Sequence, residues 1–163
     1  MNEKFIIGAI VNNHFGVLNR VTALFSRRGY NIDSLVVGMT DDSNLSRMTI
    51  VATGDEYIKD QIVKQLGKLH DVVRVGIIPD DIAVVREHML VKLRVDSGAN
   101  ADITDVINRF GAKVIDFSAN TITAEVTGEA ASNDEFVDTV RGYGIIEICR
   151  AGAQALHRDG ETL

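Results

Sequence analysis

The apolar residues of this chain run through one order of periodicities twice, and few folds accommodate such an internal repeat. In each half, a strand-like apolar run leads into residues at helical spacing, two β-rich segments, a second helical pattern and a closing strand. In the first half we expect strands over 5–11, 31–38, 45–53 and 72–78, and helices over 17–28 and 58–69. In the second half the matching strands are 89–95, 113–118, 121–126 and 145–149, with helices over 103–110 and 136–140.

A βαββαβ unit of this length favours a four-stranded antiparallel sheet with two helices on one face, the ferredoxin-like arrangement. We therefore predict an α+β fold of two tandem ferredoxin-like βαββαβ units. The single proline, Pro79, begins a polar segment that is typical of a linker. We expect a first domain at 1–78, a linker at 79–87 and a second domain at 88–163, with no strong pattern after residue 150.

The first strand carries apolar residues on both of its alternating faces, although two helices cover only one face of such a sheet. Each unit is also small, and a domain of roughly 60 residues buries only about 60% of the surface of its unfolded chain. A second copy of the chain, by sheet pairing or by face packing, is the most economical cover for the other face. The sequence therefore predicts a homodimer.

Composition and charge exclude several classes of protein. The 163 residues are 45% hydrophobic and 25% charged, which is typical of a soluble globular protein. No apolar run approaches the roughly 18 residues of a membrane span, and the N-terminus lacks the features of a signal peptide, so we expect a cytoplasmic protein with no membrane partner. Of 17 basic and 23 acidic residues, eight and fifteen follow residue 78. This acidic second half argues against binding to nucleic acid.

No catalytic motif is present in the sequence. It contains no G-x-S-x-G elbow, P-loop, G-x-G-x-x-G after a strand, C-x-x-C or H-E-x-x-H. The four histidines, His14, His70, His88 and His157, are far apart in the chain, which favours structural or surface roles over metal binding. Cys149 follows apolar neighbours and is expected to be a small core residue. The sequence therefore indicates no catalytic or metal site, although it does not exclude an enzyme.

The junction between the first strand and the first helix allows two interpretations. Gly16 can supply a tight or left-handed turn that Asn13 begins, without any ligand. Alternatively, the missing side chain lets a ligand approach the backbone, and the free N–H groups at the start of the helix bind a carboxylate. Local chemistry alone favours the turn.

Five segments of the chain form a recognisable set. They are Asn13-x-x-Gly16-Val17-Leu18-x-Arg20-Val21, Leu24-Phe25-Ser26-Arg27-Arg28-Gly29-Tyr30-Asn31-Ile32-Asp33-Ser34-Leu35, Leu45-Ser46-Arg47-Met48-Thr49-Ile50, Asp71-Val72-Val73-Arg74-Val75 and Val85-Arg86-Glu87-His88-Met89-Leu90-Val91-Lys92. The set resembles the small subunits of acetohydroxyacid (acetolactate) synthase, whose first unit is an amino-acid-binding ACT domain. The likeness is strongest up to Lys92 and afterwards rests on the order and length of the elements.

The resemblance implies a non-catalytic regulatory subunit. In that family the catalytic large subunit carries thiamine diphosphate, FAD and magnesium, and it condenses two pyruvates, or pyruvate with 2-oxobutyrate, in the biosynthesis of valine, leucine and isoleucine. The small subunit raises that activity and confers feedback inhibition, usually by valine. We therefore expect no cofactor in this chain, a large subunit and a second copy of the chain as partners, and a branched-chain amino acid as allosteric effector.

The resemblance also implies a site between two ACT domains, where the loop after the first strand of one copy meets the start of the second strand of the other. The effector-binding residues carried over by position are Asn13, His14, Phe15, Gly16, Val17, Leu18, Asn31 and Ile32. Backbone N–H groups near Gly16 and Val17 are expected to bind the effector carboxylate, and side-chain oxygens of Asn13 or Asn31 its ammonium group.

Two other functions stay open from the sequence. One is a tandem-domain amino-acid sensor that controls a different enzyme or transcription, although a helix-turn-helix signature and a basic patch are missing. The other is a small standalone enzyme on a ferredoxin-like scaffold, which the absence of catalytic motifs disfavours.

Overall fold

A computed structural model describes residues 3–95 and 100–163 and divides the chain into two compact units. The first unit comprises Met1–Val85 together with Ala153–Leu163, and the second comprises Arg86–Gly152. Each unit is built from four antiparallel strands and two helices in the order expected from the repeat. The predicted α+β class and the tandem ferredoxin-like units are confirmed.

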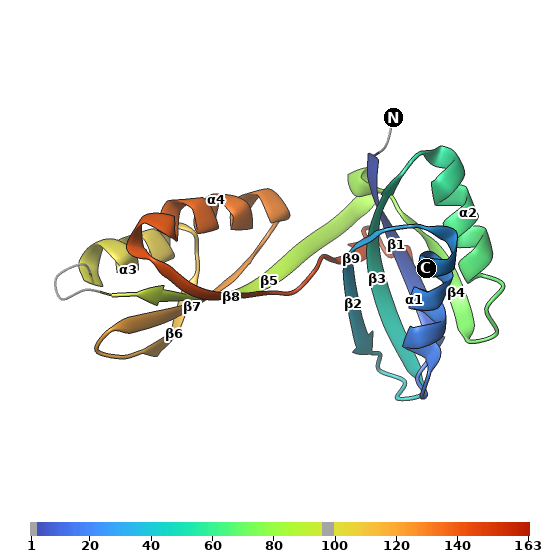
Figure 1. Cartoon of the computed structure of the whole chain (residues 1–163), viewed down its shortest axis with the longest axis horizontal. Coiled ribbons are helices and arrows are strands. Elements are labelled where there is room, and N and C mark those ends of the chain that lie inside the picture. Colours follow the sequence, from blue (N-terminus) through green and yellow to red (C-terminus); the bar gives the residue numbers. More distant parts are fainter. Residues whose placement is uncertain (1–2, 96–99) are drawn as a thin grey trace. The chain divides into compact units, whose positions relative to one another are not determined.

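In the first unit the strand order is β2-β3-β1-β4, with every neighbouring pair antiparallel. The elements are β1 (Glu3–Asn12), α1 (Val17–Arg28), β2 (Ile32–Met39), β3 (Leu45–Gly54), α2 (Glu56–Leu66) and β4 (Val72–Ile78). Both helices lie on one face of the sheet (Figure 1). β1 and β3 are central strands, and the β1–α1 loop, residues 13–16, leaves the sheet at the end of β1.

The second unit repeats this topology with the strand order β6-β7-β5-β8. Its elements are β5 (Ala83–Arg94), α3 (Asn100–Arg109), β6 (Lys113–Phe117), β7 (Thr121–Gly128), α4 (Ala130–Val140) and β8 (Ile145–Arg150). The core lies between the helices and the sheet, and includes an edge-to-face contact of Phe110 with Phe136 at 5.4 Å between ring centroids. A last short strand, β9 (Gln154–His157), pairs with β5.

β1 is buried on both of its faces. The side chains on the helix side are Phe5, Ile7, Ala9 and Val11. They pack with buried residues of α1, β3 and α2, namely Val17, Val21, Leu24, Phe25, Met48, Ile50, Ala52, Ile62 and Leu66. Burying one such large side chain stabilises a fold by about 1.5–3 kcal/mol, so this cluster is a main source of stability of the first unit.

The other face of β1 is covered by the end of the same chain, residues 153–163, which we call the tail. A second buried cluster on this face contains Ile6, Ile78, Ala83 and Ala155. Farther along the tail, the Leu163 side chain lies against Gly8 and Gly76, in the space that side chains at those positions would take. The tail therefore shields the face that the helices leave open.

Polar contacts attach the tail to three strands of the sheet. They are Ala153 N–H to Ser34 Oγ (3.2 Å), Arg47 Nη2 to the carbonyl oxygen of Ala155 (2.9 Å) and Arg74 Nη1 to the carbonyl oxygen of Leu163 (2.8 Å). Burial, and secondly the charge of Arg74, lowers the pKa of the Arg47 guanidinium. The hydrogen bond to the tail offsets part of that cost of burial.

The structure differs from the sequence-based expectation at the tail. The sequence predicts a second copy of the chain on the open face of β1, but the tail lies there instead. It packs with the first unit, whereas the expected second domain, 88–163, includes it. The apolar residues of the tail that contact the sheet are too far apart in the sequence to form a periodic pattern.

Two smaller expectations also differ from the structure. The expected linker, 79–87, contains a 3-10 turn, Asp80–Ile82, and the start of β5. Cys149 is exposed rather than buried, because it lies on the edge strand β8 and pairs with Leu90, on the face of the sheet opposite to the core residues Met89 and Val91. The apolar neighbours of Cys149 in the sequence therefore did not predict its burial correctly.

We expect Ala155→Asp to destabilise the first unit and Leu156→Asp to leave it nearly unchanged. Ala155 is 3% exposed in the cluster around Ile6, whereas Leu156 is 58% exposed. A carboxylate at position 155 loses water without gaining a partner, and because the tail can detach, the loss is limited to about 1–3 kcal/mol. Urea unfolding followed by circular dichroism measures both variants, and equal midpoints would contradict the placement of the tail.

Candidate effector-binding site

The β1–α1 loop is held by two other segments of the first unit. The Asn12 N–H donates to the carbonyl oxygen of Asp71 (2.8 Å), and the Asn13 N–H donates to that of Asn44 (2.7 Å). The Asn13 side chain adds a hydrogen bond from Nδ2 to the carbonyl oxygen of Ser43 (2.9 Å). The turn between β2 and β3 and the residue before β4 therefore fix the position of the loop.

A buried carboxylate lies behind this loop. Asp71 is 5% exposed; its Oδ1 lies 2.9 Å from His14 Nε2 and its Oδ2 lies 2.7 Å from Arg20 Nε. The other ring nitrogen of His14, Nδ1, lies 3.1 Å from the carbonyl oxygen of Phe15. Both ring nitrogens of His14 therefore lie within hydrogen-bonding distance of an oxygen atom. We call these side chains the His14–Asp71–Arg20 cluster.

The cluster favours the ionised form of Asp71. Burial by itself would raise the pKa of this carboxyl group. The hydrogen bond from Arg20, together with the charges of Arg20 and His14, outweighs burial, and the pKa of Asp71 lies below its ordinary value. A negative charge is thus held beside the start of α1 by two groups that can be cationic.

The start of α1 has the backbone geometry of an anion site. Gly16 is the N-cap residue, with φ 88° in the left-handed region, and among the described residues no side chain caps the helix and no acidic residue occupies its first turn. α2 differs, because the Asp55 side chain accepts a hydrogen bond from the Ile58 N–H and Glu56 follows in the first turn. The Val17 N–H donates to the carbonyl oxygen of His14 (3.4 Å), so the N–H groups that follow it in the first turn can bind a carboxylate.

The predicted residues that follow Asn13 and His14 differ in what they can offer a ligand. Val17 is 3% exposed and belongs to the core, so only its backbone can contact a small molecule. Phe15 is 100% exposed and Leu18 is 45% exposed. The structure leaves the side chains of Phe15 and Leu18, but not that of Val17, open to a ligand or a partner.

The two remaining predicted residues, Asn31 and Ile32, lie at the opposite end of the same sheet. Ile32 pairs with Ala52 at one end of β3, whereas Asn12 pairs with Leu45 at the other end. The seven residue steps between these two levels correspond to about 23 Å along the strand. One copy of the chain therefore does not bring the two predicted halves of the site together.

The side chain of Asn31 is engaged by a local hydrogen bond. Its Nδ2 donates to Asp33 Oδ1 (2.6 Å), and the Thr53 hydroxyl donates to Asp33 Oδ2 (2.6 Å). Ile32 packs against the core on the helix side. The bond to Asp33 uses the amide nitrogen of Asn31 and not its side-chain oxygen. That oxygen can therefore accept a hydrogen bond from an ammonium group.

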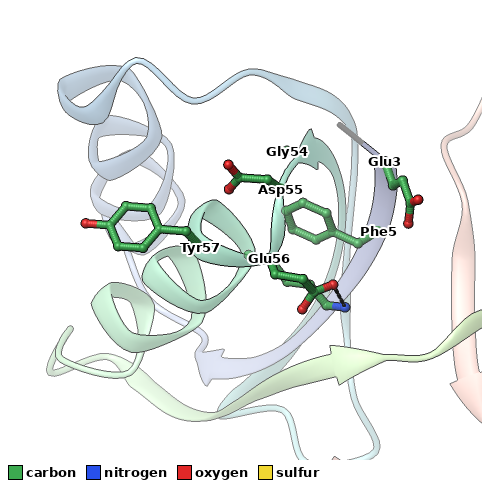
Figure 2. A pocket seen from close by; sticks show the side chains of 7 residues that line it. Glu3, Phe5, Gly54, Asp55, Glu56 and Tyr57 are labelled. Atoms are coloured by element: carbon green, nitrogen blue, oxygen red, sulfur yellow. Dashed lines mark hydrogen bonds and ion pairs between the residues drawn. The ribbon is translucent and has the colours of Figure 1, made fainter. Parts of the chain in front are cut away.

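A hollow of about 410 Å³ also lies at the Asn31 end of the sheet. Its lining residues are Glu3, Phe5, Gly54, Asp55, Glu56, Tyr57 and Lys59, of which none is a predicted effector residue. Figure 2 shows Phe5 among the acidic side chains, with Glu56 bound to Lys59. Since Asp55 caps α2 and Glu56 pairs with Lys59, these two carboxylates already have partners. The hollow does not mark the predicted effector site.

The described residues form neither a metal site nor a membrane-spanning helix. Within 3–95 and 100–163, no group of three His, Cys, Asp or Glu side chains is placed to hold a metal ion. No helix in these parts of the chain is long and apolar enough to cross a membrane.

Sequence reasoning did not single out Arg20 and Asp71, although both belong to the segments that carry the family resemblance. The two residues lie 51 positions apart in the chain. No periodicity connects them, and only the folded sheet brings the residue before β4 next to the start of α1. The local signal in the sequence is an acidic residue directly before a predicted strand.

Two sequence models of known families match the chain. The one described as "AHAS small subunit-like ACT domain" matches residues 7–74, and the one described as "Small subunit of acetolactate synthase" matches residues 86–159. The matches fall on the two halves of the repeat in the expected order. The first unit is thereby an ACT domain.

Individual proteins with the same architecture are similar over nearly the whole chain. The "Probable acetolactate synthase small subunit" of Methanothermobacter thermautotrophicus is 39% identical over 162 residues, covering 99% of this chain and 96% of its own. The acetolactate synthase small subunit of Mycobacterium bovis is 40% identical over 152 residues, covering 93% and 90%. The crystal structure of the acetolactate synthase small subunit from Thermotoga maritima matches with a TM-score of 0.92 at 34% identity, covering 98% and 99%.

Replacing Asp71 should change how stability depends on acid pH. An ordinary Asp has a pKa of about 3.9, and the folded-state pKa of Asp71 is lower. Its charge therefore stabilises the fold above about pH 4, and this contribution is lost as the pH falls through the folded-state pKa. Asp71→Asn should be less stable than the wild type at neutral pH and should lose less stability between about pH 5 and pH 3.

Urea unfolding at a series of pH values measures this difference. Asp60→Asn is the control, because Asp60 forms an exposed pair with Lys64 (3.2 Å) and should leave the pH profile unchanged. If Asp71→Asn and the wild type give parallel profiles, the cluster does not hold Asp71 in its charged form.

Proposed function

The chain belongs to the family of acetolactate synthase small subunits, and on that premise we propose that it makes a catalytic large subunit sensitive to a branched-chain amino acid, with valine as the expected effector. It binds the large subunit in the cytoplasm, raises acetolactate formation and confers feedback inhibition on the biosynthesis of valine, leucine and isoleucine. The observation that carries this proposal is that both units of the chain match the two parts of the family, in the same order. An ACT domain alone would not identify the partner, because ACT domains occur with many partners.

The catalytic chemistry belongs to the partner. Thiamine diphosphate, FAD and magnesium are assigned to the large subunit, and the role of this chain is to change the activity of that subunit. Regulation of this kind requires that effector-bound and effector-free small subunits interact differently with the large subunit. Such couplings are typically about 1–3 kcal/mol.

We place the effector site between two copies of the chain. The separation of the β1–α1 loop from Asn31 along the sheet supports this placement, because one copy cannot supply both halves. β2 is an edge strand, and antiparallel pairing with β2 of a second copy would set the start of one strand beside the end of the other. Val37 and Met39 lie near the end of β2, and their side chains are 42% and 67% exposed. Such a homodimer would bury part of this apolar surface.

The ligand that fits these groups is a free amino acid. First-turn N–H groups of α1, next to Gly16, suit its carboxylate, and the side-chain oxygen of Asn31 from the second copy suits its ammonium group. Exposed Leu18 supplies an apolar contact for its side chain. One methylene group more or less changes affinity by only about 1–3 kcal/mol, so valine, leucine and isoleucine compete on similar terms.

Reconstitution with the matching large subunit tests the proposed function. The chain should increase the rate of acetolactate formation, and millimolar valine should remove most of that increase, while the large subunit alone should respond to neither. Stimulation without any response to valine, leucine or isoleucine would contradict the effector assignment. Absence of stimulation would point to the amino-acid sensor, and product formed without the large subunit would point to an enzyme.

Two substitutions test whether the site is shared between copies. Gly16→Asp strains a left-handed backbone and adds a carboxylate near the ligand carboxylate, and Asn31→Ala removes an acceptor for the ammonium group. Each variant alone should bind valine roughly 5- to 150-fold more weakly than the wild type, as measured by calorimetry.

Mixing these two variants gives the sharper result. After the copies are exchanged by mild denaturation and refolding, a dimer of one Gly16→Asp chain and one Asn31→Ala chain has one doubly altered site and one wild-type site. The mixture should therefore regain high-affinity sites in about a quarter of the binding positions if exchange is random. A site within one chain predicts no recovery at all, and that result would overturn the shared site.

A further inference from the structure

We propose that Arg20 binds the carboxylate of the effector, and that Asp71 is the positioning residue that holds Arg20 for this contact. The inference rests on the proposed function, because it adds a residue to that effector site. It follows from the contacts of the His14–Asp71–Arg20 cluster at the start of α1.

The Arg20 side chain reaches the loop from within the helix. Side chains of an α-helix tilt toward its N-terminus, so a long side chain at position 20 extends back over the first turn. Arg20 Nη1 and Cζ lie 3.6 and 3.9 Å from the place that a Cβ on Gly16 would occupy. The guanidinium group therefore flanks the glycine whose neighbouring N–H groups suit a carboxylate.

The Arg20 guanidinium is also accessible and has donors to spare. Its side chain is 50% exposed, and its bond to Asp71 Oδ2 uses the Nε–H, one of the five N–H donors of an arginine. Arginine binds carboxylates through two parallel N–H donors, which a single contact at Nε leaves possible at the two Nη atoms. The bond at Nε fixes the plane of the group.

The charges at this helix end favour an added anion. A cation near the N-terminus of a helix is opposed by the helix dipole, and the first turn of α1 contains no acidic residue. Asp71 offers one negative charge to both Arg20 and His14. A bound carboxylate would add a second acceptor for the Arg20 guanidinium and would lie at the positive end of the helix dipole.

A competing explanation is that Arg20 only ties α1 to Asp71 and so keeps the loop folded. The two explanations differ in the ligand groups to which Arg20 responds. A purely structural arginine would change the affinity for every ligand of the loop in the same proportion. An arginine that contacts the carboxylate affects only ligands that have one.

Binding of valine and of valinamide separates the two explanations. Valinamide keeps the ammonium group and the side chain but lacks the carboxylate. Arg20→Gln retains an amide that can donate to Asp71. In the full-length chain, we expect this variant to bind valine at least about tenfold more weakly than the wild type, and valinamide within about threefold of the wild type. NMR titration up to high millimolar ligand covers the weaker affinities.

Arg28→Gln is the matched control, because Arg28 is an exposed arginine in the last turn of the same helix. It should leave both affinities unchanged. Equal losses for valine and valinamide in Arg20→Gln, or no loss for either, would overturn the inference while the proposed function stands. A wild-type chain that binds none of the branched-chain amino acids would instead refute the effector site itself.

The positioning role of Asp71 is tested by two variants at that position. Asp71→Ala removes both acceptors of Arg20 and His14, whereas Asp71→Asn keeps one side-chain oxygen for Arg20 Nε. We expect Asp71→Ala to weaken valine binding about as much as Arg20→Gln and Asp71→Asn to recover most of it, with thermal unfolding confirming that both are folded at the assay temperature. Equal valine affinities for Asp71→Ala and the wild type would overturn the positioning role.

Discussion

The first unit depends on the burial of β1 from every side. This strand is hydrogen-bonded to β3 along one edge and to β4 along the other, and the helices and the tail cover its two faces. A strand so enclosed has one position relative to its neighbours. The loop that leaves it at Asn12 therefore starts from a fixed point, which is what a site for a ligand as small as an amino acid requires.

The order of elements could be predicted from sequence because each element carries its own periodicity. β4 begins and ends at the expected residues. α1 begins at the expected residue, because glycines lie on both sides of the helix. The tail could not be predicted, since the partner of Ala155 is the distant strand residue Ile6, and a short segment of small residues has no period of its own. Burial of Cys149 was wrong because apolar composition does not separate an edge strand from a central one.

For the candidate site too, the sequence indicated individual segments but not how the fold arranges them. The family resemblance indicated the β1–α1 loop and Asn31, but it does not say that they lie at opposite ends of one sheet, which follows from the register of β3. In the proposed site, that separation would link regulation to the association of two copies, because a ligand that bridges them stabilises the pair. The charge beside the loop depends on Asp71, which is separated from the loop in the chain by two helices and two strands.

The way the tail is attached has a consequence for how its sequence can drift. Arg47 and Arg74 donate hydrogen bonds to main-chain oxygen atoms of the tail, which every amino acid possesses. These two contacts therefore tolerate exchange of the tail residues, whereas the Arg158 side chain, which donates to the carbonyl oxygen of Ala83 (3.0 Å), and the packed side chains of Ala155 and Leu163 depend on residue identity. In a comparison of related sequences such a segment would look like a dispensable end, although it closes a hydrophobic face. Two of the residues that attach it, Arg47 and Arg74, belong to the strands beneath it and not to the tail itself.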